Sequence, residues 1–452
     1  MATPDPDPAL HPPGDEDAEH LVDLTAAPEA AAPLVPAEII AQSLGDYFRA
    51  RLVRIRSGDS GFLPVLVGMV AIVIVFQIIS PNHSFLTAGN IVNLFQQSAV
   101  YITLGMAEIF VLLLGEIDLS LGYLGPVGAV IAIQLVEPAS GNWPWEPAVV
   151  VALLCCAFIG FIQGSLVSRL GIPSFIVTLA GLLILNGAML LLLAIGPFSG
   201  YPSLNGKSGN LHALYQFMWG HVSPVTGWIA MAVVVGLLGL FTILRDARRR
   251  RAGLVAPPLS VNLIKMGVIA AAGVVVVIIC NLNRANIGVL SGVPYAIFIV
   301  LGVLAVWTFL LSRMRYGRYL YAIGGNAEAA RRAGVNVARI RTMAFVLAAV
   351  TAGVAGLLYA SYLGGMSNNV NGGQLVLYAV AAAVIGGTSL LGGRGKVSAG
   401  ILGGLVIGGI NNGLYLMGLQ VQWQFIVTGG VLMAAVLIDA LSRRRAVASG
   451  VR

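Results

Sequence analysis

The sequence predicts an all-α polytopic membrane protein, and three observations lead to that class. Of the 452 residues, 58% are hydrophobic and only 10% are charged, whereas a soluble domain typically carries about 25% charged residues. The apolar residues are grouped in long runs. These runs lack the apolar and polar alternation of a membrane β-barrel, so each is expected to cross as a helix that satisfies its own backbone hydrogen bonds.

The apolar runs set the number of expected crossings. A helix needs about 20 apolar residues to cross the hydrocarbon core of a bilayer. We find about twelve such runs, which together form a transmembrane domain over residues 58–442. The predicted helices cover residues 62–80, 96–115, 119–136, 148–167, 174–195, 226–244, 263–281, 293–311, 343–363, 375–391, 399–417 and 421–441.

The basic residues indicate the orientation of these helices. With a cytoplasmic N-terminus, twelve crossings leave only Lys207 and Arg284 outside, so 24 of the 26 Lys and Arg lie on the inner side. Loops that face the cytoplasm are enriched in these residues. We therefore expect both termini in the cytoplasm. The net charge of +7 then reflects membrane orientation and gives no reason to expect nucleic-acid binding.

The two ends of the chain differ from the apolar middle. Ten of the 19 Asp and Glu lie within residues 1–46, among many Pro and Ala. Such a segment buries too little apolar surface to fold, and it lacks the basic start and apolar core of a signal peptide. We expect residues 1–57 to form a disordered acidic tail with a basic juxtamembrane end, and residues 443–452 to form a basic cytoplasmic C-terminus.

The longest predicted cytoplasmic loop, residues 313–341, contains the stretch GGNAEAARRAGVNV. Asn326 is a favourable N-cap, Glu328 places negative charge in the first helical turn, and Gly334 suits the helix end. A helix of about two turns is not stable alone, so we expect it to dock on a cytoplasmic partner; the alternative is a capped loop helix. The docking residues would be Asn326, Glu328, Ala329, Ala330, Arg331, Arg332 and Gly334.

Four stretches resemble a known family. EAARRAG, residues 328–334, is similar to the loop by which permease subunits of ABC importers dock into their ATPase subunits. Together with GEIDLSLG (115–122), GIPSFIVTLAG (171–181) and VIGGTSLLGGRG (384–395), it resembles the ribose, xylose, arabinose and galactose branch of bacterial sugar permeases. The likeness covers residues 51–445. Within the branch, Glu116 and the basic linker 245–251 resemble the xylose-type members.

The resemblance implies an ABC importer permease fold in the inner membrane of a bacterium, with a monosaccharide such as D-xylose as cargo. The implied partners are an ATPase subunit, an extracytoplasmic sugar-binding protein, a second copy of the permease and membrane lipid. This chain would hold no catalytic, metal or cofactor site, since ATP and Mg²⁺ would bind to the ATPase. In agreement, GKS at 206–208 and GGRGKV at 392–397 lack the glycine spacing of a phosphate-binding loop.

Polar side chains within the apolar runs are candidates for a translocation path or gate. A carboxylate in hydrocarbon costs several kcal/mol, so Glu108 should face protein or water. The stretch GEIDLSLG is either a turn at the interface or a helix break that lines the path. For the amides, the alternative is an interhelical hydrogen bond. The candidates are Gln97, Tyr101, Glu108, Glu116, Asp118, Ser120, Asn186, Asn411 and Asn412.

Other functions stay open at this point. A self-contained secondary transporter could couple to protons through Glu108, Glu116 or Asp118, and it would need no ATPase. An ABC permease could instead carry another sugar, a nucleoside or a branched-chain amino acid. A membrane enzyme is disfavoured, because no His, Cys or carboxylate group stands at catalytic spacing in the sequence.

Overall fold

The fold is described from a computed structural model of the chain. The described residues are 45, 49, 63–195, 202–204, 209–254, 256–285, 288–420, 422–431, 433, 434 and 437. Apart from residues 45 and 49, the predicted N-terminal tail lies outside these residues, as does the predicted C-terminal segment 443–452. The domain boundaries expected at both ends therefore stay predictions.

The described residues are almost entirely helical, so the all-α class is confirmed. In chain order the elements are α3 (Leu63–Ile79), the 3-10 helix η2 (Pro81–Leu86), α4 (Ala88–Leu112), α5 (Leu121–Val136), α6 (Trp145–Arg169), α7 (Ser174–Ile195), α8 (Gly209–Trp219), α9 (Pro224–Arg251), α10 (Leu259–Asn281), α11 (Tyr295–Arg313), α12 (Arg315–Gly325), α13 (Ala327–Arg332), α14 (Val337–Leu363), α15 (Gly372–Ile385) and α16 (Ala399–Leu416).

The described helices support a protein that crosses the membrane several times. Eight of them are long and apolar enough to do so: α4, α6, α7, α9, α10, α11, α14 and α16. The helices α3, α5 and α15 are apolar but shorter. Twelve complete crossings stay a prediction, while α8 and α12 are helices that the apolar runs did not predict.

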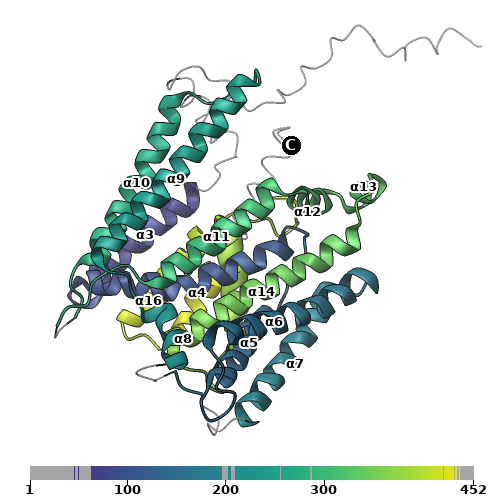
Figure 1. Cartoon of the computed structure of the whole chain (residues 1–452), viewed down its shortest axis with the longest axis horizontal. Helices are drawn as coiled ribbons and strands as arrows, with labels where there is room; N and C mark the ends of the chain where they lie inside the picture. Colours follow the sequence, from purple (N-terminus) through teal and green to yellow (C-terminus); the bar gives the residue numbers. More distant parts are fainter. Residues whose placement is uncertain are drawn as a thin grey trace, which may run out of the picture.

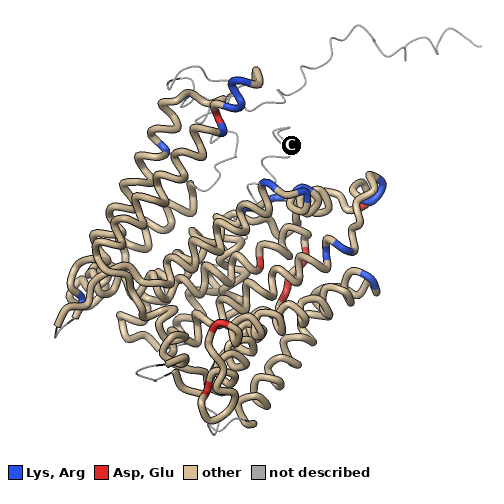
Figure 2. Tube along the Cα trace, in the orientation of Figure 1, with Lys and Arg blue, Asp and Glu red and all other residues tan. Residues whose placement is uncertain are grey.

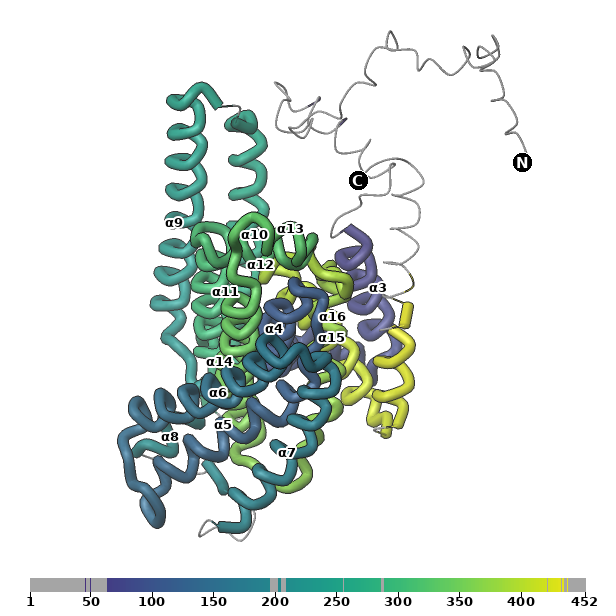
Figure 3. The backbone as a smooth tube through the Cα atoms, turned by 90° about the vertical axis from the view of Figure 1, so that its right-hand side faces the viewer, coloured from purple at the N-terminus to yellow at the C-terminus, as the bar shows by residue number. Residues whose placement is uncertain are grey.

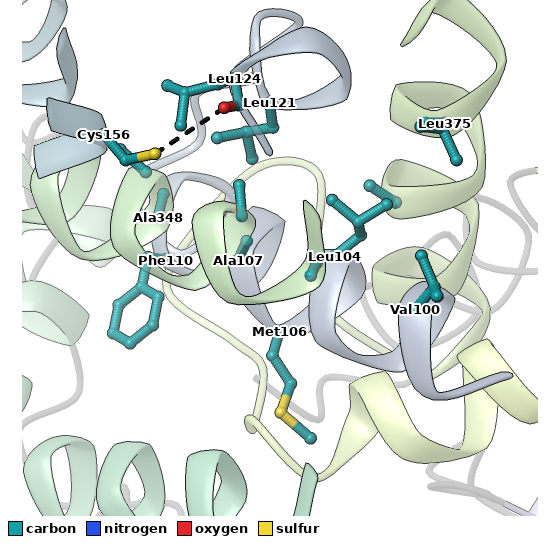
Figure 4. Packing of buried hydrophobic residues seen from close by; sticks show 14 of the residues in the cluster. Val100, Leu104, Met106, Ala107, Phe110, Leu121, Leu124, Cys156, Ala348 and Leu375 are labelled. Atoms are coloured by element: carbon teal, nitrogen blue, oxygen red, sulfur yellow. Dashed lines mark hydrogen bonds between the residues drawn. The ribbon is translucent and has the colours of Figure 1, made fainter. Parts of the chain in front are cut away.

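The core of the bundle is built around α14, which packs against α4, α5 and α6, while α15 and α16 pack against α4 and each other (Figure 1). Figure 4 shows α4 side chains such as Leu104 and Phe110 in this core. Small residues let the helices approach closely. A Cβ atom on Gly356 would lie 2.0 Å from the Gly125 carbonyl oxygen, and one on Gly403 would lie 1.7 Å from that of Ala382. The backbones of α14 and α5, and those of α16 and α15, are therefore in direct contact.

The hairpin of α9 and α10 lies at the side of this core and contacts α4 through α10. Its two helices pack against each other, and it rises beyond the level of α12 and α13 (Figure 3). Among the described residues of α9, only Gly227 and Asp246 are buried. Asp246 accepts hydrogen bonds from Arg245 on its own helix and from Asn262 on α10. The exposed apolar surface of the hairpin is suited to lipid, and its basic end is held together by polar contacts.

Lys and Arg gather along one edge of the molecule, at the end of α9 and around α12 and α13 (Figure 2). Arg169 at the end of α6 and Arg341 near the start of α14 belong to helix ends on the same side. The described basic residues at these helix ends are among those that the sequence analysis assigned to the cytoplasm, while residues 51–56 and 443–452 lie outside the described part of the chain. Which side of the membrane this edge faces stays a prediction.

Candidate functional site

The stretch GEIDLS forms a break between α4 and α5. Helix α4 ends at Leu112, and the chain turns at Gly115, whose φ of +77° lies in the left-handed region that favours glycine. The next residues run without helical structure until α5 begins at Leu121. The Thr178 hydroxyl on α7 donates to the Ile117 carbonyl oxygen at 3.3 Å. The break is therefore packed inside the bundle.

Two fully buried carboxylates hold this break together. The Glu108 Oε1 atom on α4 accepts the backbone N–H of Asp118 at 3.2 Å. The Asp118 Oδ1 atom accepts the Ser120 backbone N–H at 2.9 Å and the Ser120 hydroxyl at 2.6 Å. The Ser120 Oγ atom also lies 2.9 Å from the Gln163 Oε1 atom on α6. We call Glu108, Asp118, Ser120 and Gln163 the carboxylate cluster, and it links α4, α6 and the break.

Burial leaves part of the cluster without partners. The Glu108 Oε2 and Asp118 Oδ2 atoms make no hydrogen bond with the residues that the structure describes.

Glu116 points to a different neighbour. Its Oε1 atom lies 3.1 Å from the Nε atom of Arg341 on α14. The two atoms form an ion pair without the geometry of a hydrogen bond. Burial raises the pKa of Glu116, and the positive charge of Arg341 opposes this rise. The sequence analysis did not predict Arg341 as a partner, because charge alone does not select one Arg of this loop.

A separate pocket lies between α4, α14, α15 and α16. Its volume is about 180 Å³, and three of the predicted path residues, Gln97, Tyr101 and Asn411, line it. Six further polar residues of the lining are not among the nine candidates that the sequence analysis named. The complete lining is Gln97, Tyr101, Tyr359, Asn371, Gln374, Leu375, Tyr378, Asn411, Tyr415 and Gln424.

The spacing of polar residues along the helices could have indicated some of the lining residues that the sequence analysis did not name. Gln97 and Tyr101 stand four residues apart on α4, as do Gln374 and Tyr378 on α15. Side chains four residues apart lie on the same face of a helix. Pairs of an amide and an aromatic residue at this spacing, inside apolar helices, are therefore a signal for a shared polar surface.

The pocket presents aromatic rings and amides in an ordered arrangement. The Tyr378 hydroxyl donates to Asn411 Oδ1 at 3.0 Å, and the rings of Tyr101 and Tyr378 meet edge to face with centroids 5.2 Å apart. The Gln97 Nε2 atom donates to the Tyr362 hydroxyl at 3.0 Å. Its Oε1 atom is buried and has no hydrogen-bond partner among the described residues.

Two predicted path residues lie elsewhere. Asn412 is fully buried and exchanges hydrogen bonds with Asn90 on α4, which agrees with the alternative of an interhelical bond. Asn186 is half-buried on α7 and makes no side-chain hydrogen bond with the described residues. The structure thus divides the predicted residues among the pocket, the carboxylate cluster, the Glu116–Arg341 pair and these two positions.

The short helix α13 lies on the basic edge. The Asn326 Oδ1 atom accepts the Ala329 backbone N–H at 2.9 Å, and Gly334 has a φ of +82° just beyond the helix. Glu328 lies 3.4 Å from Arg331 and 3.3 Å from Arg332, and all three side chains are exposed. Exposed ion pairs contribute little stability, so these side chains remain available to a partner.

The helix bundle and its pocket together indicate the class of this protein. A bundle of apolar helices with a polar interior pocket is typical of a membrane permease. Among the described residues, no group of three His, Cys, Asp or Glu could hold a metal ion. Residues 90–436 match the family described as branched-chain amino acid transport system / permease component, and the chain belongs to this family.

Individual relatives are sugar permeases. The chain is 32% identical to the xylose transport system permease protein XylH of Escherichia coli (strain K12), over 84% of this chain and 92% of the relative. It is 33% identical to XylH of Haemophilus influenzae, over 83% and 95%, and 29% identical to the D-allose transport system permease protein AlsC of Escherichia coli, over 82% and 89%. No solved structure matches the chain.

Proposed function

We propose that this chain is the membrane-spanning permease subunit of an ATP-driven importer for a neutral monosaccharide, D-xylose or a related pentose. The observation that carries the proposal is the pocket, whose lining contains tyrosines and amides but no Asp, Glu, Lys, Arg or His among the described residues. Sugar hydroxyls form hydrogen bonds with amides, the C–H face of a sugar ring packs on aromatic side chains, and a few polar groups of this kind set specificity in small-molecule sites.

The same lining separates a sugar from the amino acids named in the family description. A branched-chain amino acid carries a carboxylate and an ammonium group, and each loses hydration on entering a pocket. The described lining offers no opposite charge for either group. The xylose and allose permeases among the relatives agree with a sugar cargo. The pocket therefore supports a neutral polyhydroxyl compound.

The proposed arrangement in the membrane follows from the helices and charges. Twelve crossings, with the segment 421–441 as the last, would put the basic edge of Figure 2 and both termini in the cytoplasm. The membrane would be the inner membrane of a bacterium. In this orientation α13 projects from the cytoplasmic edge and acts as a coupling helix.

The proposed partners supply what this chain lacks. A separate ATPase subunit would bind ATP and Mg²⁺ and dock on α13 through residues such as Glu328 and Arg331. An extracytoplasmic protein would deliver the sugar, and two copies of the permease, surrounded by lipid, would complete the importer. This chain would move the sugar by alternating access and carry out no covalent chemistry.

Uptake of radiolabelled D-xylose into proteoliposomes tests the proposal. The vesicles would contain this chain, with and without a cognate ATPase and binding protein, and would be compared with Glu328→Arg and the milder Glu328→Gln. We expect uptake to need both partners and ATP. Charge reversal at α13 should reduce it by about tenfold or more, the size of a typical coupling between distant sites, and the neutral variant should lie between.

Three outcomes would contradict parts of the proposal. Uptake by the chain alone along a proton gradient would identify a secondary transporter. ATP-dependent uptake of leucine but not of D-xylose would replace the sugar with a branched-chain amino acid. A normal uptake rate in Glu328→Arg would remove α13 from the docking surface, and the melting temperature of each variant would show that loss of uptake is not loss of folding.

A further inference from the structure

Three backbone segments meet beside α13: the start of the break at Leu113–Gly115, the end of α12 at Gly324, and the loop residues Gly392 and Gly393. The Gly393 backbone N–H donates to the Leu113 carbonyl oxygen at 2.9 Å. A Cβ atom on Gly324 would lie 1.8 Å from that same oxygen and 2.5 Å from the Gly393 nitrogen. We call this contact the glycine joint.

The glycine joint is close on every side. A Cβ atom on Gly392 would lie 2.8 Å from the Gly115 nitrogen and 3.0 Å from the Gly324 carbonyl oxygen. Gly392 and Gly393 have φ angles of +83° and +72°, which disfavour other residues. Backbone in van der Waals contact on several sides transmits a displacement, because packed interiors have low compressibility. The joint therefore has no flexible side chain that could absorb a movement.

Along the chain, α13 lies between a residue of the glycine joint, Gly324, and a residue of the Glu116–Arg341 ion pair, Arg341. Gly324 lies three residues before the first residue of α13, Ala327, and Arg341 lies near the start of α14, which follows α13. The ion pair joins Arg341 to the break at 3.1 Å. The Tyr321 hydroxyl on α12 also donates to the Gly395 carbonyl oxygen at 2.8 Å. The segment before α13 and the segment after it thus both contact the break.

The break in turn contacts the helix that lines the pocket. Asp118 donates its backbone N–H to Glu108, and Glu108 lies on α4 with Gln97 and Tyr101. Tyr101 is seven residues before Glu108, which is about 10 Å along a helix. A movement of the break would therefore reach α4 through a buried hydrogen bond.

We propose that the glycine joint and the Glu116–Arg341 pair fasten α13 to the GEIDLS break, so that displacement of α13 moves the break and, through Glu108, the pocket helix α4. The inference rests on the proposed function and adds to it the residues that carry the motion. Gly324, Glu116 and Arg341 are positioning residues, since none of them lines the pocket. This role explains why a carboxylate stands at Glu116, beside the end of an apolar helix.

Two neighbouring glycines give a matched test in the complete complex with ATPase and binding protein. In Gly324→Ala the new methyl group meets the Leu113 carbonyl oxygen, whereas around Gly325 there is nothing within 4 Å of the added Cβ atom. We expect sugar taken up per ATP hydrolysed to fall about tenfold in Gly324→Ala, as for loss of a typical coupling between sites. It should stay at the wild-type value in Gly325→Ala, and the ATPase should co-purify with both.

A second set of variants keeps the test informative if Gly324→Ala does not assemble. Glu116→Gln, Arg341→Gln and the double variant form a cycle in which two residues of one interaction are not additive. Each single change should lower uptake per ATP about fivefold, and the double variant should lower it no further. A change that only weakened folding would lower the melting temperature and leave this ratio unchanged.

The outcomes separate the inference from the function on which it rests. If the wild-type complex shows no ATP-dependent uptake, the proposed function fails and the inference fails with it. If the wild type transports sugar while Gly324→Ala and the charge variants keep its ratio of uptake to ATP, only the inference is wrong. Additive losses in the double variant would likewise show that Glu116 and Arg341 do not act as one contact.

Discussion

The pocket and the carboxylate cluster are both polar regions inside an apolar bundle, but they are built in opposite ways. The described lining of the pocket is uncharged, and Gln97 Oε1 is an acceptor without a hydrogen-bond partner in the described structure. The cluster contains two buried carboxylates, of which Glu108 binds the Asp118 backbone and Asp118 binds Ser120. The cluster commits Glu108 Oε1 and Asp118 Oδ1 to the backbone of the break, whereas the pocket places uncharged polar side chains around a space of about 180 Å³.

This difference between the pocket and the cluster gives a criterion for distinguishing residues of the translocation path from residues that hold the fold. Both kinds of residue are polar and occur within or between apolar helices, so the sequence analysis placed Gln97 and Asp118 in one group. A polar atom that already bonds the backbone is committed to the fold, because leaving its buried partner unpaired costs about 1–3 kcal/mol. Three variants test this distinction, in order of decreasing expected effect.

The largest effect is expected for Asp118→Leu. The change removes the acceptor of the Ser120 backbone N–H and hydroxyl, and we expect a loss of about 3 kcal/mol in unfolding free energy. Asp118→Asn retains one oxygen acceptor and should lose less. Denaturation of the purified protein in detergent measures both. Wild-type stability together with lost uptake in Asp118→Leu would place Asp118 on the path and remove the contrast with the pocket.

An intermediate effect is expected for Gln97→Leu, which removes a polar group from the pocket. The maximal rate of sugar uptake should fall about fivefold, since one hydrogen bond contributes about 1 kcal/mol and about 1.4 kcal/mol corresponds to a factor of ten. Gln96→Leu is the control, because Gln96 is buried on the same helix but donates to the Met218 carbonyl oxygen. That control should lower the melting temperature instead. Equal effects of the two changes on uptake would show that the pocket has no special role.

The smallest effect is expected for Asn186→Ala. This side chain is half-buried on α7 and makes no hydrogen bond with the described residues, so both stability and uptake should change little, by less than about 0.5 kcal/mol in unfolding free energy. Thermal melting and the proteoliposome uptake assay provide the two measurements. A severalfold loss of uptake would return Asn186 to the translocation path that the sequence analysis assigned to it.

Much of the fold was predictable because its signals are local. The apolar runs predicted helices over most of the described chain, and Asn326 and Gly334 stand where their helix-end preferences place them. The helices α8 and α12 were missed, since short helices with mixed polarity give no long apolar run. Gln97, Tyr101 and Asn411, three candidates for the translocation path, line the pocket, whereas the positions of Tyr359 and Gln374 depend on which faces of α14 and α15 meet α4.

By itself, the sequence determined the membrane class, the asymmetry of basic residues and the presence of rare polar groups in apolar helices. These follow from hydropathy and charge, which act residue by residue. Only the tertiary structure decided that Glu116 meets Arg341, that Asp118 binds Glu108, and that Gly324 touches Leu113. The first and third of these contacts join segments far apart in the chain, and all three depend on how closely the backbones approach, which the periodicity of each single helix does not specify.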